Sequence, residues 1–268
     1  MENATDTTFE QRVQDQLANG QTLLDLENQA IGVKELEQLR EIECFTQVQK
    51  LYLGNNELTD DTLIPLEKLG GNLHSLYLNN NLIGDAGAET LANSPLMGSI
   101  RCLMLEGNSI GPKGAKALAN SPYFQKLEEL FLDSNPIGAD GVLTLSQSNN
   151  FPNLKALHLD STGMGDGGVI ALSNTKTLLG LERLYLCSNH IGNVGALALA
   201  KSDSLKTLRV LSIWRNEIRD EAGEAMIASS TFDNLERLYM SLNLIERPVR
   251  KKIRGSDLAK RLKTLVMD

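Results

Sequence analysis

A short pattern of leucines recurs along most of the chain at a nearly constant spacing. Leucines alternate with variable residues, and an asparagine follows three positions after the last leucine, giving the phrase L-x-x-L-x-L-x-x-N. The residues that close the phrase are Asn56, Asn81, Asn108, Asn135, Thr162, Asn189, Asn216 and Asn243, with a weaker copy at Gln29. Successive copies lie 27 residues apart, except that Asn56 and Asn81 are separated by 25 residues. This period predicts about nine repeated units stacked along one axis.

Within each unit, the alternation predicts a short strand. Leu76 and Leu78 would face the core, whereas Tyr77 between them would lie on the outer surface of the sheet. One such strand is too short to bury its apolar side, so neighbouring units must stack. The asparagine is expected to turn inward, where its amide can satisfy backbone groups in the turns of adjacent coils. Because a threonine hydroxyl satisfies fewer groups, we expect the sixth unit, with Thr162, to be locally weaker.

The residues after each asparagine predict a helix. They follow the pattern I-G-x-x-G-A-x-x-L-A, as in residues 83–92, and a polar residue or proline stands near the start, as helix N-termini favour. The repeated glycine in the first helical turn predicts close packing against the neighbouring coil. Asn93-Ser94-Pro95 would end the helix. Each unit therefore reads as strand, turn, helix and loop.

The phrase LYLNNNLIGDAGAETLA, residues 76–92, resembles the ribonuclease-inhibitor-like class of leucine-rich repeats. The resemblance covers residues 21–245 and implies a leucine-rich repeat domain over that range. The implied fold is α/β, a right-handed, horseshoe-shaped solenoid with a parallel β-sheet on its concave face and α-helices on its convex face. The class includes sensor regions of NOD-like receptors, Ran GTPase-activating proteins and bacterial proteins. The shared residues are structural, so the resemblance implies the fold and names no partner.

Apolar residues at helical spacing precede the repeats, namely Phe9, Val13 and Leu17. They would form one stripe on a short helix, with Thr7 or Thr8 as its cap. Terminal units of a solenoid need a polar outer face, because nothing stacks on them. We therefore expect residues 1–20 to form an N-terminal helical cap.

Residues 246–268 depart from the repeat and are strongly basic. Their apolar residues fall into two helical groups, Val249 with Ile253, and Leu258 with Leu262 and either Leu265 or Val266. Residues 255–257 would end the first helix and cap the second. We predict a basic C-terminal helical cap over residues 246–268. Its charged side is either simply solvated, or a patch for an acidic partner or anionic lipid, or a nuclear import signal.

Composition narrows the classes of function. The net charge of −8 gives no support to nucleic-acid binding. The first twenty residues contain no signal peptide core, and no stretch of 18 apolar residues could span a membrane. We expect a cytoplasmic monomer without a cofactor. A protein exported by a specialised secretion machine would have the same features, so that alternative stays open.

The three cysteines are predicted to be free thiols. Cys102 and Cys187 lie three repeats apart, which places them on the order of 14 Å or more apart in a parallel sheet. A disulfide requires Cα atoms within about 7 Å. Free thiols suit a reducing compartment, which agrees with a cytoplasmic location.

The residues between the strand leucines would form one outward column on the concave face, and its members include Tyr52, Tyr77, Met104, Phe131, His158, Tyr185 and Tyr239. Trp214 would lie on the same face. Exposed aromatic residues on a sheet are unusual unless something covers them, and Tyr and Trp are enriched at binding hot spots. Alternatively, cross-strand aromatic pairs stabilise the sheet itself, by up to about 1 kcal/mol each. We predict that these residues bind a protein partner.

The next outward column contains Glu106, Asp133 and Asp160 on neighbouring strands. Like charges on adjacent strands disfavour a sheet, so their presence suggests that a basic partner surface docks there. Arginines follow on later repeats, at Arg183, Arg209, Arg215 and Arg237. A face that grades from acidic to basic would orient a partner as it approaches. The alternative is that all of these charges are solvated.

The candidate chemistry on this face is weak. His158, Asp160 and Asp133 would lie on neighbouring strands. The sequence shows no clear spacing for a third and fourth ligand, so these residues do not indicate a metal site. The sequence contains no G-x-S-x-G motif, Walker A loop or Cys-His signature. We therefore predict neither a catalytic nor a metal site.

The sequence favours a non-enzymatic module that binds a protein on its concave face. A Ran-type GTPase-activating protein is one alternative, although proteins of that kind end in an acidic tail whereas this chain ends in a basic one. The recognition part of an innate sensor or of a bacterial effector is the other.

Overall fold

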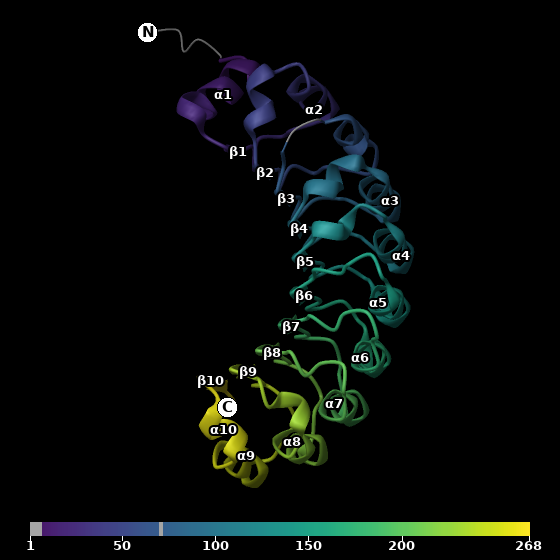
Figure 1. The fold of residues 1–268 in the computed structure, drawn as a ribbon, viewed down its shortest axis with the longest axis vertical. Coiled ribbons are helices and arrows are strands. Elements are labelled where there is room, and N and C mark those ends of the chain that lie inside the picture. The colour runs from purple at the N-terminus through teal and green to yellow at the C-terminus, as the bar shows by residue number, and fades with distance from the viewer. Residues whose placement is uncertain (1–6, 70–71) are drawn as a thin grey trace.

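One parallel sheet of ten short strands lines the inner side of an arc (Figure 1). The computed structural model describes residues 7–69 and 72–268. Each strand pairs with the next one along the chain. The strands are β1 (Leu23–Asp25), β2 (Lys50–Tyr52), β3 (Ser75–Tyr77), β4 (Cys102–Met104), β5 (Glu129–Phe131), β6 (Ala156–His158), β7 (Arg183–Tyr185), β8 (Val210–Ser212), β9 (Arg237–Tyr239) and β10 (Thr264–Val266). Equivalent residues of the repeats are paired, such as Leu76 with Leu103, so each repeat position becomes a column across the sheet.

The α-helices from α2 to α9 follow the outer side of the arc, and α1 and α10 lie at its two ends (Figure 1). They are α1 (Phe9–Gln16), α2 (Val33–Leu39), α3 (Asp85–Asn93), α4 (Pro112–Asn120), α5 (Gly138–Gln147), α6 (Gly165–Ser173), α7 (Asn193–Ala200), α8 (Asp220–Ile227), α9 (Arg247–Arg254) and α10 (Asp257–Arg261). Packed helices lie about 8–10 Å apart and paired strands about 4.8 Å apart, so the helical side is longer and the stack curves. The predicted α/β leucine-rich repeat solenoid, with its sheet on the concave face and helices on the convex face, is confirmed.

Short 3-10 helices complete the units: η1 (Ala18–Gly20), η2 (Glu43–Gln47), η3 (Asp61–Lys68), η4 (Pro95–Ser99), η5 (Phe124–Lys126) and η6 (Ser230–Phe232). Most of them lie between a convex helix and the next strand, whereas η3 takes the place of the convex α-helix in its unit. That unit is the one whose spacing is 25 residues, and η3 contains Pro65, which has no backbone N–H for an α-helical bond.

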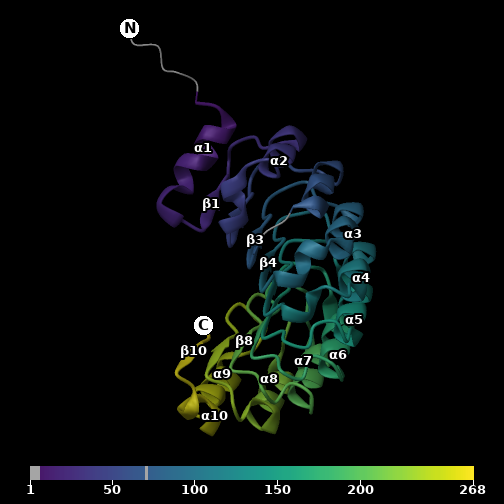
Figure 2. The ribbon, with the colours of Figure 1, turned by 45° about the horizontal axis from the view of Figure 1, so that its top comes forward.

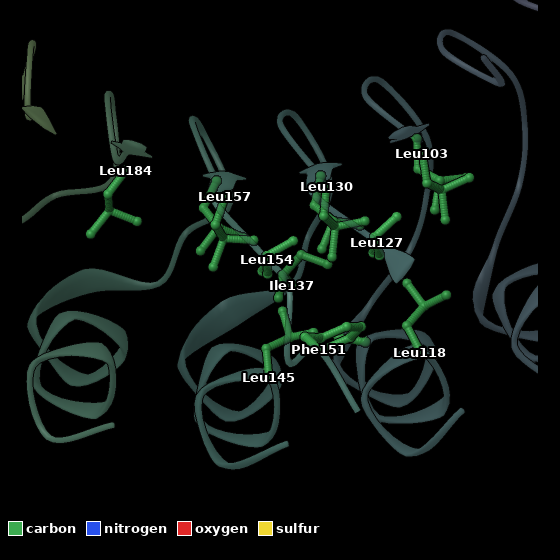
Figure 3. Close-up of a cluster of buried hydrophobic side chains, with 14 of the residues drawn as sticks. Leu103, Leu118, Leu127, Leu130, Ile137, Leu145, Phe151, Leu154, Leu157 and Leu184 are labelled. Carbon is green, nitrogen blue, oxygen red and sulfur yellow. The ribbon is translucent and has the colours of Figure 1, made fainter. Parts of the chain in front are cut away.

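The core is a continuous apolar layer between sheet and helices. Leu103, Leu130, Leu157 and Leu184 project from successive strands toward the helices in Figure 3. Leu118, Leu145 and Phe151 meet them from the other side and are equally buried. No unit has a core of its own, which is why burial depends on stacking.

The asparagine ladder predicted from the repeats is present. Asn189 is fully buried; its Nδ2 donates to the carbonyl oxygens of Leu159 at 2.7 Å and Cys187 at 3.1 Å. Its Oδ1 accepts from the backbone N–H of Thr162 at 2.9 Å. The amide therefore connects its own turn to the turn of the preceding coil.

Thr162 changes the ladder locally. Its hydroxyl donates to the carbonyl of Leu159 and lies 3.0 Å from Asn189 Oδ1. In the preceding coil, the N–H of Ile137 donates to the carbonyl oxygen of Asn135 within the same coil. Gly138 has a φ of +63°. Helices α5 and α6 both begin one residue earlier in the repeat than α3 or α4, at Gly138 and Gly165. That the unit is also weaker remains a prediction.

Aspartates near the helix N-termini cap the helix of the following coil, a role that the sequence reading missed. Asp166 Oδ1 accepts from the backbone N–H groups of Gly192 at 2.8 Å and Gly195 at 2.9 Å. Asp85 does the same for Gly111 and Gly114. A carboxylate at a helix N-terminus satisfies unpaired N–H groups and is favoured by the helix dipole. These bonds tie successive convex helices together.

The two ends of the stack lie at opposite ends of the arc, with α1 at one and α10 at the other (Figure 2). Thr8 Oγ1 caps α1 by accepting from the N–H of Gln11, and Val13 and Leu17 are buried against the core. Residues 1–6 of the predicted N-terminal cap lie outside the described residues. The domain boundaries at residues 20 and 245 remain predictions.

The C-terminal segment is not helical throughout. Ser256 caps α10, as expected, by accepting from the N–H of Ala259 at 3.2 Å. The prediction that Leu265 or Val266 continues the second helix is wrong, because residues 264–266 form strand β10 beside β9. The strand covers the edge that β9 would otherwise expose.

Within residues 7–69 and 72–268, no helix is both long and apolar enough to cross a membrane.

Candidate functional site

The in-register sheet gathers the predicted aromatic residues into one column on the concave face. Its members Tyr52, Tyr77, Met104, Phe131, His158, Tyr185 and Tyr239 are all half-buried. Trp214 lies just beyond β8 and is 37 % exposed, more than any of them. The structure therefore places the predicted residues on one surface that a partner could contact.

The rings form two stacks. Tyr52 and Tyr77 lie 4.1 Å apart between ring centroids, with an interplanar angle of 5°. His158 is held between Phe131 at 3.9 Å and Tyr185 at 4.1 Å. Stacked cross-strand pairs stabilise a sheet, so these residues have a structural role whatever they bind. They also form rigid apolar surfaces, which lose little conformational entropy when a partner covers them.

His158 is neutral at physiological pH. Burial, with a smaller contribution from the positive charge of Arg183, lowers the pKa of its imidazole to about 4. Its Nδ1 lies 4.0 Å from Asp133 Oδ2. Because the ring is uncharged, this contact is not an ion pair near neutral pH.

The acidic column is partly engaged within the sheet. Asp133 Oδ1 accepts from the backbone N–H of Asp160 at 2.6 Å, and Asp160 Oδ1 accepts from the N–H of Cys187 at 2.6 Å. Asp133 is only 9 % exposed, whereas Glu106 and Asp160 are half-buried. The carboxylates thus satisfy N–H groups where the strands end, a role that the residue types alone did not reveal.

Burial raises the pKa of Asp133 to about 7. Within this net shift, the hydrogen bond from the N–H of Asp160 opposes the effect of burial, whereas the negative charges of Asp160 and Glu106 add to it. Burial also raises the pKa of Asp160. The run of three acidic residues therefore carries less negative charge at neutral pH than its composition suggests.

We predict that Asp133→Asn stabilises the protein by about 2 kcal/mol above pH 7 and changes it little near pH 4. The folded state keeps the Asp133 proton up to about pH 7, whereas the unfolded chain loses it near its ordinary value. The free energy of unfolding therefore falls as pH rises through this interval, and asparagine, which cannot ionise, removes the loss. Urea unfolding of both proteins from pH 4 to pH 8 measures the difference.

Asp140→Asn is the matched control, because Asp140 is exposed on α5. It should leave the pH dependence of wild type unchanged. A constant difference between Asp133→Asn and wild type at all pH values would contradict the assigned ionisation.

The arginines of the later repeats are partly neutralised. Arg183 Nη2 lies 2.5 Å from Glu129 Oε1, two strands away, reaching across the small side chain of Ala156. Arg209 Nη1 lies 2.7 Å from Glu236 Oε1. The expected gradient from acidic to basic is correspondingly shallower.

The basic C-terminal residues are also largely paired. Four lysines and arginines contact carboxylates, namely Lys252 with Glu224, Lys260 with Asp257, Arg261 with Asp233 and Lys263 with Glu236. Arg250 and Arg254 donate to the carbonyl oxygens of Asp268 and Met267. Exposed pairs of this kind contribute little stability each, but they reduce the charge offered to an acidic partner or lipid.

Groups that support metal or thiol chemistry are not assembled in the described part of the chain. No three His, Cys, Asp or Glu side chains of these residues are grouped to hold a metal ion. Cys44, Cys102 and Cys187 are free. Burial raises the thiol pKa of both Cys102 and Cys187 to about 11, so these two thiols are protonated at neutral pH and poor nucleophiles.

Comparison with known families matches four segments of the chain to the model described as Leucine Rich repeat, at residues 72–92, 99–119, 152–173 and 181–200. Each segment contains a concave strand and most or all of the convex helix that follows it. The comparison with curated proteins found no match.

Proposed function

We propose that this chain, four segments of which match the leucine-rich repeat model, is a non-enzymatic module that binds a folded protein partner across its concave sheet. The aromatic column beside the exposed Trp214 carries this proposal. Tyr and Trp anchors supply apolar area and a polar group each, and residues of this type dominate measured hot spots. Because the sheet curves inward, these aromatic side chains could all contact one convex partner (Figure 1).

We expect the combined change Tyr77→Ala, Phe131→Ala and Tyr185→Ala to weaken partner binding by about 100-fold or more. A partner captured from lysate by the wild-type protein would be identified by mass spectrometry and purified, and its dissociation constant measured by calorimetry. Because these rings stack in the sheet, Trp214→Ala is a milder second test, with an expected loss of about tenfold.

The matched control carries three alanines on exposed convex positions, Lys113→Ala, Gln147→Ala and Lys201→Ala. It should bind as wild type does. Unchanged binding by a folded aromatic triple variant would contradict the concave site. A Ran-type activity, the alternative left open by the sequence, would instead accelerate phosphate release from a small GTPase.

We propose further that the partner presents a basic surface to Glu106, Asp133 and Asp160. The raised pKa of Asp133 supports a specific signature, since its charge develops as pH rises through about 7. Binding should then tighten from pH 6 to pH 8 and weaken with added salt. The net charge of −8 argues against nucleic acid as the partner, and the three free cysteines are compatible with action in the cytoplasm.

A further inference from the structure

One repeat position on the convex helices forms a column of side chains. Read from helix to helix, this column is complementary to the same column read in the opposite direction. The position lies in the middle of each helix from α3 to α9 and recurs every 27 residues: Glu89, Lys116, Leu143, Ile170, Leu197, Glu224 and Lys251. Read outward from the central isoleucine, a leucine stands on each side. Beyond the leucines, lysine on one side corresponds to glutamate on the other, and glutamate then corresponds to lysine.

The centre of this column is an exposed apolar surface. Leu143 is 42 % exposed and Ile170 is 37 % exposed. Leu197 is half-buried against the core, and Val194, about one turn before it on α7, is 60 % exposed. Between α5 and α6 runs a groove of about 560 Å³, whose lining includes Leu143, Ile170 and Ala171. Single exposed aliphatic residues need no explanation, but a patch across three successive helices indicates a contact surface.

We propose that a second copy of this chain covers the patch, related to the first by a two-fold axis through Ile170. A two-fold interface places the same surface of both copies in contact, so the surface must be complementary to itself. Ile170 would meet Ile170 of the second copy, and Leu143 would meet Leu197. Lys116 would face Glu224 at both ends of the contact.

The position of the axis follows from the charges. An axis through α5 would place Ile170 against Lys116 and Leu197 against Glu89. An axis through α7 would place Ile170 against Glu224 and Leu143 against Lys251. Burying an apolar group against a charge that loses its water is unfavourable, so only the axis through α6 matches both the apolar and the charged positions.

The two-fold axis lies in the plane of the contact and runs parallel to the helices, because this direction reverses the order of the helices. It leaves their direction unchanged, so the N-terminal parts of facing helices meet. Val194 lies about one turn before Leu197 on α7 and would therefore lie against the N-terminal half of α5 of the second copy.

The curvature of the molecule sets the strength of this contact. Two convex surfaces touch over their central helices and separate beyond them, where long Lys116 and Glu224 side chains can span the gap. The buried area would fall below the about 800 Å² per partner of a standard interface, so the dimer should be weak and depend on concentration. The concave sheets would face away from each other and stay open, so a dimer could bind two partner molecules and gain from avidity.

Sedimentation equilibrium of the full chain from about 5 µM to about 500 µM tests the proposal, since mass action makes a weak dimer depend on concentration. Wild type should shift from monomer toward dimer over this range. Ile170→Glu should remain monomeric, because two carboxylates would meet on the axis. Leu82→Glu is the control, since Leu82 is an exposed aliphatic residue outside the convex helices, and it should associate as wild type does.

Charge reversal tests the two-fold pairing itself. Lys116→Glu and Glu224→Lys should each weaken association by about tenfold, because each creates two like-charge contacts per dimer. The double variant restores opposite charges and should return to within about threefold of wild type. Glu224 also contacts Lys252 of its own chain at 2.8 Å, so urea unfolding is measured alongside to confirm that every variant is folded.

Two results would overturn the proposal: a wild-type protein that stays monomeric at the highest concentration, or a double variant no better than either single variant. This contact would replace the monomer expected from the sequence. It is independent of the concave site, since the folded aromatic triple variant should still associate as wild type does.

Discussion

Asn189→Ala should lower the free energy of unfolding by about 3–5 kcal/mol, the largest loss we expect from one side chain. Asn189 is fully buried, and its amide donates to the carbonyl oxygens of Leu159 and Cys187. Its Oδ1 accepts from the N–H groups of Thr162 and Met164. Alanine removes these bonds, together with the contact from the Thr162 hydroxyl, and leaves a space where the amide was. Each buried backbone group left without a partner costs about 1–3 kcal/mol.

Urea unfolding measures this loss, with Trp214 fluorescence reporting on the next repeat and circular dichroism on the whole chain. Asn153→Ala is the control, because the exposed Asn153 amide donates to one carbonyl, that of Gln125. It should cost less than about 1 kcal/mol, as expected for an exposed hydrogen bond. Equal losses in the two variants would show that the ladder does not carry the stability assigned to it.

The repeat made most of the fold predictable, because each spacing that recurs along the chain has one physical meaning. Leu76 and Leu78 had to face inward and Tyr77 outward, since a strand alternates its side chains and each unit buries only one side. The inward turn of the asparagines followed from the number of hydrogen bonds that an amide can make. These inferences needed only local geometry and the period.

The C-terminal strand was missed although its signal was present. Leu262, Leu265 and Met267 stand 27 residues after Leu235, Leu238 and Met240 and repeat the leucine part of the strand phrase. The helical spacing of Leu258 and Leu262 predicts that the second helix continues over these residues instead. Helix prediction uses local spacing alone, whereas β10 forms because β9 offers an unpaired edge.

The concave site shows what the sequence could not supply. The columns were predictable, but whether a carboxylate in them faces solvent depends on where each strand ends. Asp133 and Asp160 turn toward the N–H groups of the next coil and accept hydrogen bonds from them. Whether these bonds form depends on the separation between the coils, which the residue types do not reveal. The aspartate caps have the same origin, since Asp166 reaches Gly195 only because the coils pack at one particular separation.

The close packing of neighbouring coils can be tested by substitution of Gly195. Gly195→Ala should destabilise the protein by about 2–4 kcal/mol, although alanine is favoured over glycine in helices by about 1 kcal/mol. A Cβ at this position would lie 2.6 Å from Asp166 Oδ1 and 3.2 Å from Asp166 Cα. The second atom belongs to the backbone, so the coils must separate or the cap must break. Urea unfolding monitored by circular dichroism measures the loss.

Gly180→Ala distinguishes this close approach from a general effect of glycine replacement. Nothing lies within 4 Å of a Cβ at Gly180, and its φ lies outside the left-handed region. Alanine there should be neutral or should stabilise the protein by about 0.4–1 kcal/mol, since it restricts the unfolded chain. If Gly195→Ala were as harmless as Gly180→Ala, the neighbouring coils would have room to move apart, and the repeated glycine would reflect something other than their packing.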